Sequence, residues 1–188
     1  MAVGAARGAA VCGVAALLGG CGGGMTDGAR DGAAVALEEA VVRVHEAALG
    51  VRAEDPAAVD TAAADNLGEA LTGGDPAFLV STATTADGVE AVTTAGVRVE
   101  EGGGLFYQQV TLGACLLTSA TAGSPTGNVG ERGTVTTEAV ACPDGVTPVV
   151  DTAPVEATTV EIDHLQSPVP MPRPTPCFSG SGDCGAGG

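Results

Sequence analysis

The stretch that decides the fold is LFYQQVTLGACLL, residues Leu105–Leu117. Its side chains alternate between a mostly apolar face and a more polar face, and this two-residue period is that of a β-strand. The apolar face carries Phe106, Gln108, Val110, Leu112, Ala114 and Leu116, with Gln108 as the exception. The other face carries Tyr107, Gln109, Thr111 and Gly113. We therefore predict a long strand whose first face lies in the core and whose second face points outward.

Segments rich in Val and Thr lie on both sides of this strand, and turn residues separate them, a pattern that favours further strands. The expected strands are Phe78–Thr84, Val89–Thr94, Val97–Glu100 and Thr134–Cys142, with Val146–Val150 as a further candidate. The turn signals between them are Asp87-Gly88, Gly102-Gly103-Gly104 and Pro143-Asp144-Gly145. Short turns between consecutive strands predict an antiparallel meander.

Two helical patterns precede the strands. The first begins after Asp31, a helix-capping residue, and ends at Gly50, where a C-terminal cap belongs. Its apolar stripe consists of Ala34, Leu37, Val41, Val44 and Ala48. The second begins at Asp55-Pro56, a cap followed by a proline in the first turn, and ends at Gly73-Gly74. Its stripe consists of Val59, Ala63, Leu67 and either Ala70 or Leu71.

Helices that precede a meander predict an α+β fold, in which the two N-terminal helices pack on one face of an antiparallel sheet. This domain is expected to span residues 31–150. The chain is then proline-rich from Ser167 to Pro176 and glycine-rich beyond. Residues 151–188 are therefore expected to form a disordered tail.

The first 20 residues have the pattern of a secretory signal peptide. Arg7 supplies positive charge near the amino terminus, and an apolar run from Ala9 to Leu18 follows it. A helix needs about 20 apolar residues to span a bilayer, so this run is too short to be a stable membrane helix. The sequence predicts that the chain is exported and that residues 1–20 are removed.

The peptide Leu18-Gly19-Gly20-Cys21 resembles the lipobox of bacterial lipoproteins. In that family a diacylglyceryl group is attached to the cysteine thiol, and a peptidase cuts immediately before it. The resemblance implies that Cys21 is lipidated and that its acyl chains hold the protein on the outer face of the cell membrane. Residues 21–30, which begin with three glycines after Cys21, are then expected to be a flexible tether. Ordinary cleavage with a free Cys21 and an uncleaved anchor are the alternatives.

The layout of the whole chain also resembles that of small uncharacterised lipoproteins from high-GC Gram-positive bacteria. Four cysteines follow Cys21, at Cys115, Cys142, Cys177 and Cys184. An even number of cysteines in an exported chain predicts disulfides, and of the three pairings we favour Cys115–Cys142 with Cys177–Cys184. If Cys115 faces Cys142 across an antiparallel pair, Leu117 lies opposite Val140 and Ser119 lies opposite Glu138. A zinc site is the rival interpretation, but no CxxC motif occurs.

Composition excludes several functions. The net charge of −16 repels nucleic-acid backbones and anionic lipid headgroups, so we expect no nucleic-acid partner. The chain has no lysine, which excludes a Walker A loop and a pyridoxal Schiff base. We find no motif for a metal or another cofactor and expect none. The aromatic residues are few, so the core must consist mainly of Val, Leu and Ala.

The candidate binding surface is the outer face of the long strand, formed by Tyr107, Gln109 and Thr111, because an amphipathic tyrosine with amide and hydroxyl neighbours suits a ligand or partner. An ordinary solvent-facing sheet is the alternative. His45 is expected to be a solvated helix residue and His164 a surface residue. We therefore expect a non-enzymatic envelope lipoprotein that binds a partner protein, a cell-wall component or a small ligand. The alternative is an enzyme that acts on envelope polymers through scattered carboxylates, such as Glu90, Glu100 or Glu138.

Overall fold

The computed structural model describes residues 20–72, 77–103, 106–124, 132–155, 157–158, 162 and 164–170. Two helices come first, α1 (Gly20–Glu54) and α2 (Thr61–Thr72). The strands that follow are β1 (Ala77–Thr84), β2 (Gly88–Gly103), β3 (Phe106–Thr121), β4 (Thr134–Val140), β5 (Val149–Val150), β6 (Ala153–Pro154) and β7 (Leu165–Pro168).

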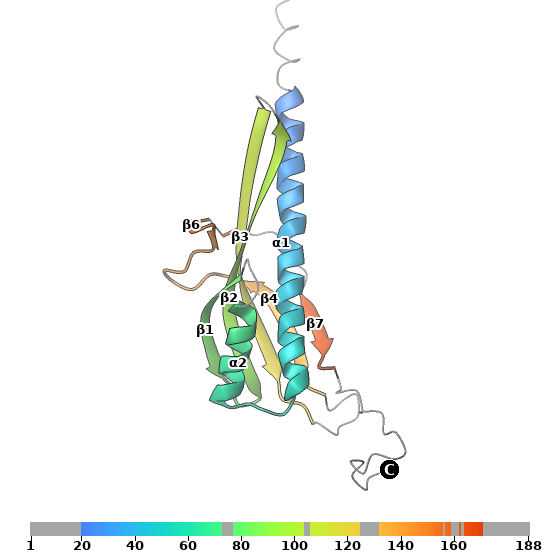
Figure 1. Ribbon diagram of the computed structural model, residues 1–188, viewed down its shortest axis with the longest axis vertical. Helices are drawn as coiled ribbons and strands as arrows, with labels where there is room; N and C mark the ends of the chain where they lie inside the picture. The colour runs from blue at the N-terminus through green and yellow to red at the C-terminus, as the bar shows by residue number, and fades with distance from the viewer. Residues whose placement is uncertain are drawn as a thin grey trace, which may run out of the picture.

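Five of these strands form one antiparallel sheet in the order β1-β2-β3-β4-β7, so the chain has the α+β fold that the sequence predicts. Helix α1 runs lengthwise along β2 and β3, and α2 contacts mainly β1 (Figure 1). The long strands β2 and β3 extend beyond the other strands together with the N-terminal half of α1 (Figure 1). We call this extension the stalk: Gly20–Ala36 of α1 with the β2–β3 hairpin from Gly96 to Gly113. The remainder is the body.

The core of the body lies between the helices and the inner face of the sheet. Its most deeply buried large side chains come from both layers and include Leu37 and Val41 of α1, Leu67 and Leu71 of α2, and Leu116 of β3. Ala, Val and Leu make up the buried cluster, as the sequence predicts. The described aromatic side chains contribute nothing to it, because Phe78 is 48% exposed and Tyr107 is 56% exposed.

The predicted boundaries of the first helix are wrong. Helix α1 begins at Gly20 and continues through Gly50 to Glu54, so residues 21–30 are helical and do not form a flexible tether. The small residues of this half allow α1 to approach the hairpin closely: Ala29 and Ala33 are buried, and a Cβ atom on Gly32 would lie 3.5 Å from Val99 Cγ1. Packing against the hairpin therefore outweighs the low helix propensity of glycine, which is about 1 kcal/mol per residue.

The second helix begins later than predicted. Helix α2 starts at Thr61, and Asp60 is its cap, since Asp60 Oδ1 accepts a hydrogen bond of 2.9 Å from the Ala63 amide. Pro56, predicted in the first turn, lies instead in the connection between the two helices. Both stripes are otherwise close to the prediction, although Ala34 is only half-buried and Val59 is exposed.

The sheet corrects the prediction of two separate strands between Val89 and Glu100. Strand β2 is continuous from Gly88 to Gly103, where the sequence predicted a break at Ala95-Gly96. Gly96 has another role. It pairs with Gly113 on β3, and the segment Pro148–Val150 crosses the outer face above this pair. A Cβ atom on Gly96 would lie 2.7 Å from the Val149 carbonyl oxygen, and one on Gly113 would lie 2.5 Å from Pro148 Cβ, so neither position has room for a side chain.

The Cys115–Cys142 disulfide is confirmed, with a Cα–Cα distance of 5.1 Å, but the register expected from it is wrong. Cys115 lies opposite Val140, Leu117 opposite Glu138, and Ser119 opposite Thr136. The two cysteines are diagonal neighbours, because Cys142 follows the end of β4 at Val140. The residues Cys177 and Cys184 lie outside the described part of the chain.

The prediction of disorder from Asp151 onward is wrong for part of the segment. The residues Leu165–Pro168 form the edge strand β7, which pairs with β4. Next to it, Val169 is 2% exposed, and its amide donates a 2.7 Å hydrogen bond to the Gly133 carbonyl. The β5–β6 hairpin also falls in this region, and Asp151 and Thr152 at its turn have positive φ angles of 49° and 71°. The predicted disorder beyond residue 170 concerns residues that the structure does not describe.

Candidate functional site

The predicted binding surface lies on the outer face of the stalk. Strand β3 brings Tyr107, Gln109 and Thr111 together on the face away from α1, with Tyr107 and Gln109 exposed and Thr111 half-buried. The neighbouring strand β2 adds Arg98 and Glu100, which pair with Thr111 and Gln109 in the sheet register. The alternating assignment of β3 to a core face and an outer face is thus confirmed for its described side chains.

The charged side chains of this surface, Arg98 and Glu100, contact neighbouring residues. Arg98 forms an ion pair of 2.5 Å with Asp151 of the β5–β6 hairpin. Tyr107 shares a hydrogen bond with Glu100, and this bond is the main reason why the pKa of the Tyr107 phenol is raised, with partial desolvation and the charge of Glu100 acting in the same direction. The charged side chains of this surface therefore already have partners, which leaves Gln109 and Thr111 as its other polar groups.

The carboxylates considered for catalysis do not form a pair. Glu100 lies in the stalk beside Tyr107, whereas Glu90 and Glu138 lie on strands that β3 separates. Each has its own neighbour: Ser119 Oγ donates to Glu90 at 3.4 Å, and His164 Nδ1 lies 3.4 Å from Glu138. His164 is a surface residue, as expected. Within the described part of the chain, no group of three His, Cys, Asp or Glu side chains is arranged to hold a metal ion.

His45 is not the solvated residue that the sequence suggested. It is 5% exposed and lies between α1 and the sheet. Its Nδ1 is hydrogen-bonded to Thr137 Oγ1 at 3.1 Å and its Nε2 to Ser167 Oγ at 3.0 Å, so the imidazole links α1 to β4 and β7. Burial lowers the pKa of His45, and the nearby charge of Glu46 opposes this shift. The role of His45 is therefore structural.

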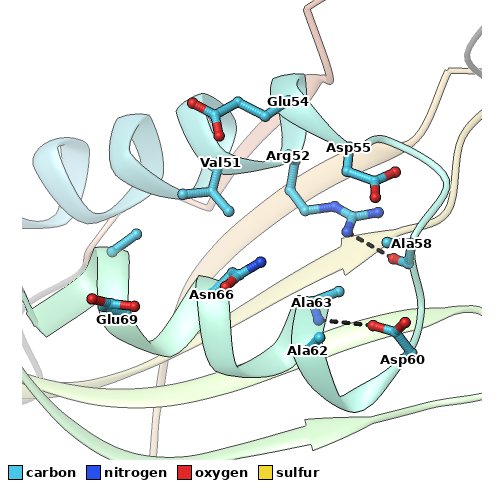
Figure 2. A pocket seen from close by; sticks show the side chains of 11 residues that line it. Val51, Arg52, Glu54, Asp55, Ala58, Asp60, Ala62, Ala63, Asn66 and Glu69 are labelled. Carbon is cyan, nitrogen blue, oxygen red and sulfur yellow. Dashed lines mark hydrogen bonds between the residues drawn. The ribbon is translucent and has the colours of Figure 1, made fainter.

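A pocket that the sequence did not indicate lies where α1 ends, at the connection to α2 (Figure 2). Its volume is about 500 Å³, which is within the usual range of roughly 300–1,000 Å³ for small-molecule sites. We call it the Arg52 pocket. It is lined by Val51, Arg52, Glu54 and Asp55 from the end of α1, Ala58 and Asp60 from the connection, and Ala62, Ala63, Asn66, Glu69 and Ala70 from α2.

Arg52 is the unusual residue of this pocket, because its side chain is charged and yet only 2% exposed. Its Nη1 donates to the Ala58 carbonyl at 2.8 Å, and its Nη2 donates to the Pro56 carbonyl at 2.9 Å. Among the described residues, no carboxylate lies at ion-pair distance from it. Burial lowers the pKa of Arg52, and the charge of Asp55 partly offsets that effect.

The sequence contained only a weak signal for this site. Arg52 stands in the last turn of α1, where a cation is favoured by the helix dipole, and Glu54-Asp55-Pro56 follows. Such a pattern is common at helix ends and does not reveal that the guanidinium is buried. Burial depends on the path of residues 55–60, which periodicity does not predict.

The predicted lipid site lies at the other end of the same helix, since Cys21 is in the first turn of α1. None of the helices among the described residues is both long enough and apolar enough to cross a membrane. Comparison of the sequence with known protein families found no match, and comparisons with curated proteins and with solved structures found none either.

Proposed function

We propose that this protein is an exported lipoprotein, held on the outer face of a cell membrane by a lipid on Cys21, and that it binds a small polar ligand in the Arg52 pocket. The observation that carries the proposal is the course of α1. This single helix begins one residue before Cys21 and ends two residues after Arg52. At about 1.5 Å per residue, it holds the pocket roughly 47 Å from the lipidated residue.

The charge of the chain supports this arrangement. Acyl chains contribute about 0.8 kcal/mol per buried CH₂, so a doubly acylated cysteine anchors a protein durably without basic residues. The net charge of −16 repels anionic headgroups, which favours an orientation with the body away from the bilayer. The helical stalk then acts as a spacer between the membrane and the pocket.

The pocket is a better candidate site than the outer face of the stalk. On the stalk, Arg98 is paired with Asp151 and Tyr107 with Glu100. In the pocket, Arg52 is a buried cation that keeps an unpaired N–H group, and the volume of about 500 Å³ is in the usual range of small-molecule sites. The charged groups of the outer face, by contrast, already have partners.

The anchor is tested by replacing Cys21 with Ser in the producing cell. We expect the C21S protein to lose both metabolic fatty-acid label and membrane association. Cys12→Ser, which changes a cysteine of the predicted leader, is the matched control and should retain both. Undiminished labelling and membrane association of the Cys21→Ser protein would show that the proposed anchor is wrong.

A further inference from the structure

One wall of the Arg52 pocket contains an unsatisfied donor that solvent does not reach in this structure. Arg52 Nε is buried and has no hydrogen-bond partner, although Nη1 and Nη2 are both bonded to backbone carbonyls. A buried N–H group without an acceptor is unfavourable, and such groups are uncommon in folded proteins. A ligand that supplies an oxygen acceptor would therefore gain a charge-assisted hydrogen bond here.

The rim of the pocket has the opposite charge. Four carboxylates surround the opening, and all belong to exposed residues: Glu54, Asp55, Asp60 and Glu69 (Figure 2). With Arg52 as the only cation among the lining residues, the pocket is net negative. A simple anion would be repelled by the rim, and a simple cation would leave Arg52 Nε without an acceptor. The site therefore favours a ligand that carries both charges.

The remaining lining is mostly small and apolar, with the side-chain amide of Asn66 as its polar exception. The apolar part consists of Val51 and four alanines, Ala58, Ala62, Ala63 and Ala70. Such a lining suits a short aliphatic body and offers no aromatic ring for stacking.

We infer that the Arg52 pocket binds a small zwitterion of the amino-acid type. Its ammonium group lies among the carboxylates of Glu54 and Glu69, and its carboxylate accepts a hydrogen bond from Arg52 Nε. Residues 55–60 cover the guanidinium, so this connection shifts when the ligand binds. The inference rests on the proposed function, because it names the ligand class of the same pocket.

The test uses the mature protein and three small probes of nearly equal size. L-alanine carries both charges, ethylamine carries only the ammonium group, and propionate carries only the carboxylate. Two-dimensional NMR of backbone amides reports where each probe binds and with what affinity. We expect L-alanine to shift the signals of residues 51–70, ethylamine to bind at least tenfold more weakly, and propionate to cause no saturable shift.

Three variants separate the contributions of the rim and the guanidinium. Glu54→Gln and Glu69→Gln change exposed carboxylates and should each weaken L-alanine binding by roughly twofold to fivefold, as expected for exposed charge pairs. Arg52→Lys removes the planar guanidinium and should abolish the preference for L-alanine over ethylamine. Glu39→Gln, an exposed α1 carboxylate outside the pocket, is the matched control and should bind like the unmodified protein.

The possible outcomes separate this inference from the proposed function. Equal binding of ethylamine and L-alanine, or binding of propionate, would overturn the zwitterion class while leaving a small-molecule pocket. A further outcome is that none of the probes binds while small molecules extracted from the cell envelope shift the NMR signals of residues 51–70. In that case the ligand class is again wrong, but the pocket is still a binding site. Shifts confined to Tyr107 and its neighbours would refute the pocket itself. The lipid on Cys21 is measured independently of all of these.

Discussion

The stalk and the body use the same helix in different ways. In the stalk, α1 meets the β2–β3 hairpin through small residues such as Ala29, Gly32 and Ala33, which allow close approach but bury little area. In the body, the same helix buries Leu37 and Val41 against α2 and the sheet. Because hydrophobic stabilisation scales with buried apolar area, at about 25 cal/mol per Å², most of the stability lies in the body. The stalk contributes length and direction.

The largest expected effect comes from the body core. Leu116→Ala should lower the free energy of unfolding by about 2–5 kcal/mol, because this side chain is fully buried and leaves a cavity. Val99→Ala in the stalk should cost only about 1 kcal/mol, since Val99 is half-buried. Denaturant unfolding followed by circular dichroism measures both. Equal losses would contradict an uneven distribution of stability.

The disulfide lies where the body meets the stalk, and its removal should have the next largest effect. Cys115→Ala with Cys142→Ala opens a loop with a sequence separation of 27 residues, for which chain entropy predicts a loss of about 3.5 kcal/mol. Reduction of the unmodified protein should give a similar loss in the same unfolding assay. Hydrogen exchange should then rise at the amides of Val149 and Val150, in the segment that crosses the outer face near this bond. Unchanged stability after removal of the disulfide would mean that the pairing of β3 with β4 is sufficient to stabilise the junction of body and stalk.

Acid should weaken the body through His45. Burial lowers the pKa of this histidine in the folded state, so the unfolded chain binds the proton more readily. The stability that depends on neutral His45 is therefore fully present above about pH 6.5, the usual value for histidine, and is lost as the pH falls toward the lowered folded value. Unfolding measured between pH 8 and pH 5 should show this loss.

The matched variants identify the responsible group. His45→Gln should flatten the decrease in stability at acid pH, because glutamine hydrogen-bonds without titrating. His164→Gln changes an exposed histidine and should retain the decrease. An identical pH profile for His45→Gln and the unmodified protein would assign the acid sensitivity to other groups.

The smallest effects compare two helical glycines. Gly32→Ala in the stalk should stabilise the protein by about 0.5–1 kcal/mol, because alanine favours the helix and its Cβ would lie 3.5 Å from Val99 Cγ1, an ordinary contact. Gly68→Ala in the body should instead destabilise by about 1 kcal/mol, since its Cβ would lie 2.8 Å from Thr82 Cγ2 and 3.0 Å from Leu79 Cδ2. Thermal unfolding measures whether each substitution stabilises or destabilises the protein. If both substitutions changed the stability in the same direction, the contacts around the two glycines would be equally tight.

The sequence correctly predicted the features of the fold that depend on local patterns along the chain. The two faces of β3, the α+β order of elements and the Cys115–Cys142 pair all follow from local pattern and cysteine number. The ends of α1 were not predicted correctly. Asp31 and Gly50 are residue types that commonly cap helices, but packing makes α1 begin before Asp31 and continue past Gly50. The register of β3 and β4 was displaced by two residues because the disulfide joins diagonal neighbours.

The features that sequence reasoning missed depend on contacts between distant segments. Ser167-Pro168 has the composition of a linker, yet Ser167 is hydrogen-bonded to His45, which is 122 residues earlier in the chain. Likewise, Arg52 is identified as unusual only when residues 55–60 close over its guanidinium and place α2 beside it. A pattern within either segment contains no information about such a closure.

In the proposed function, α1 separates a lipid-bearing end from a ligand-binding end, and fluorescence quenching in vesicles measures this separation. The mature lipoprotein would carry a fluorophore at Arg30→Cys or at Glu54→Cys, two exposed positions on α1 that are about 36 Å apart at roughly 1.5 Å per residue. Short-range quenchers would be attached to the lipid headgroups. We expect strong quenching at position 30 and at least severalfold weaker quenching at position 54. Equal quenching at the two positions would show that α1 does not hold its C-terminal end away from the membrane.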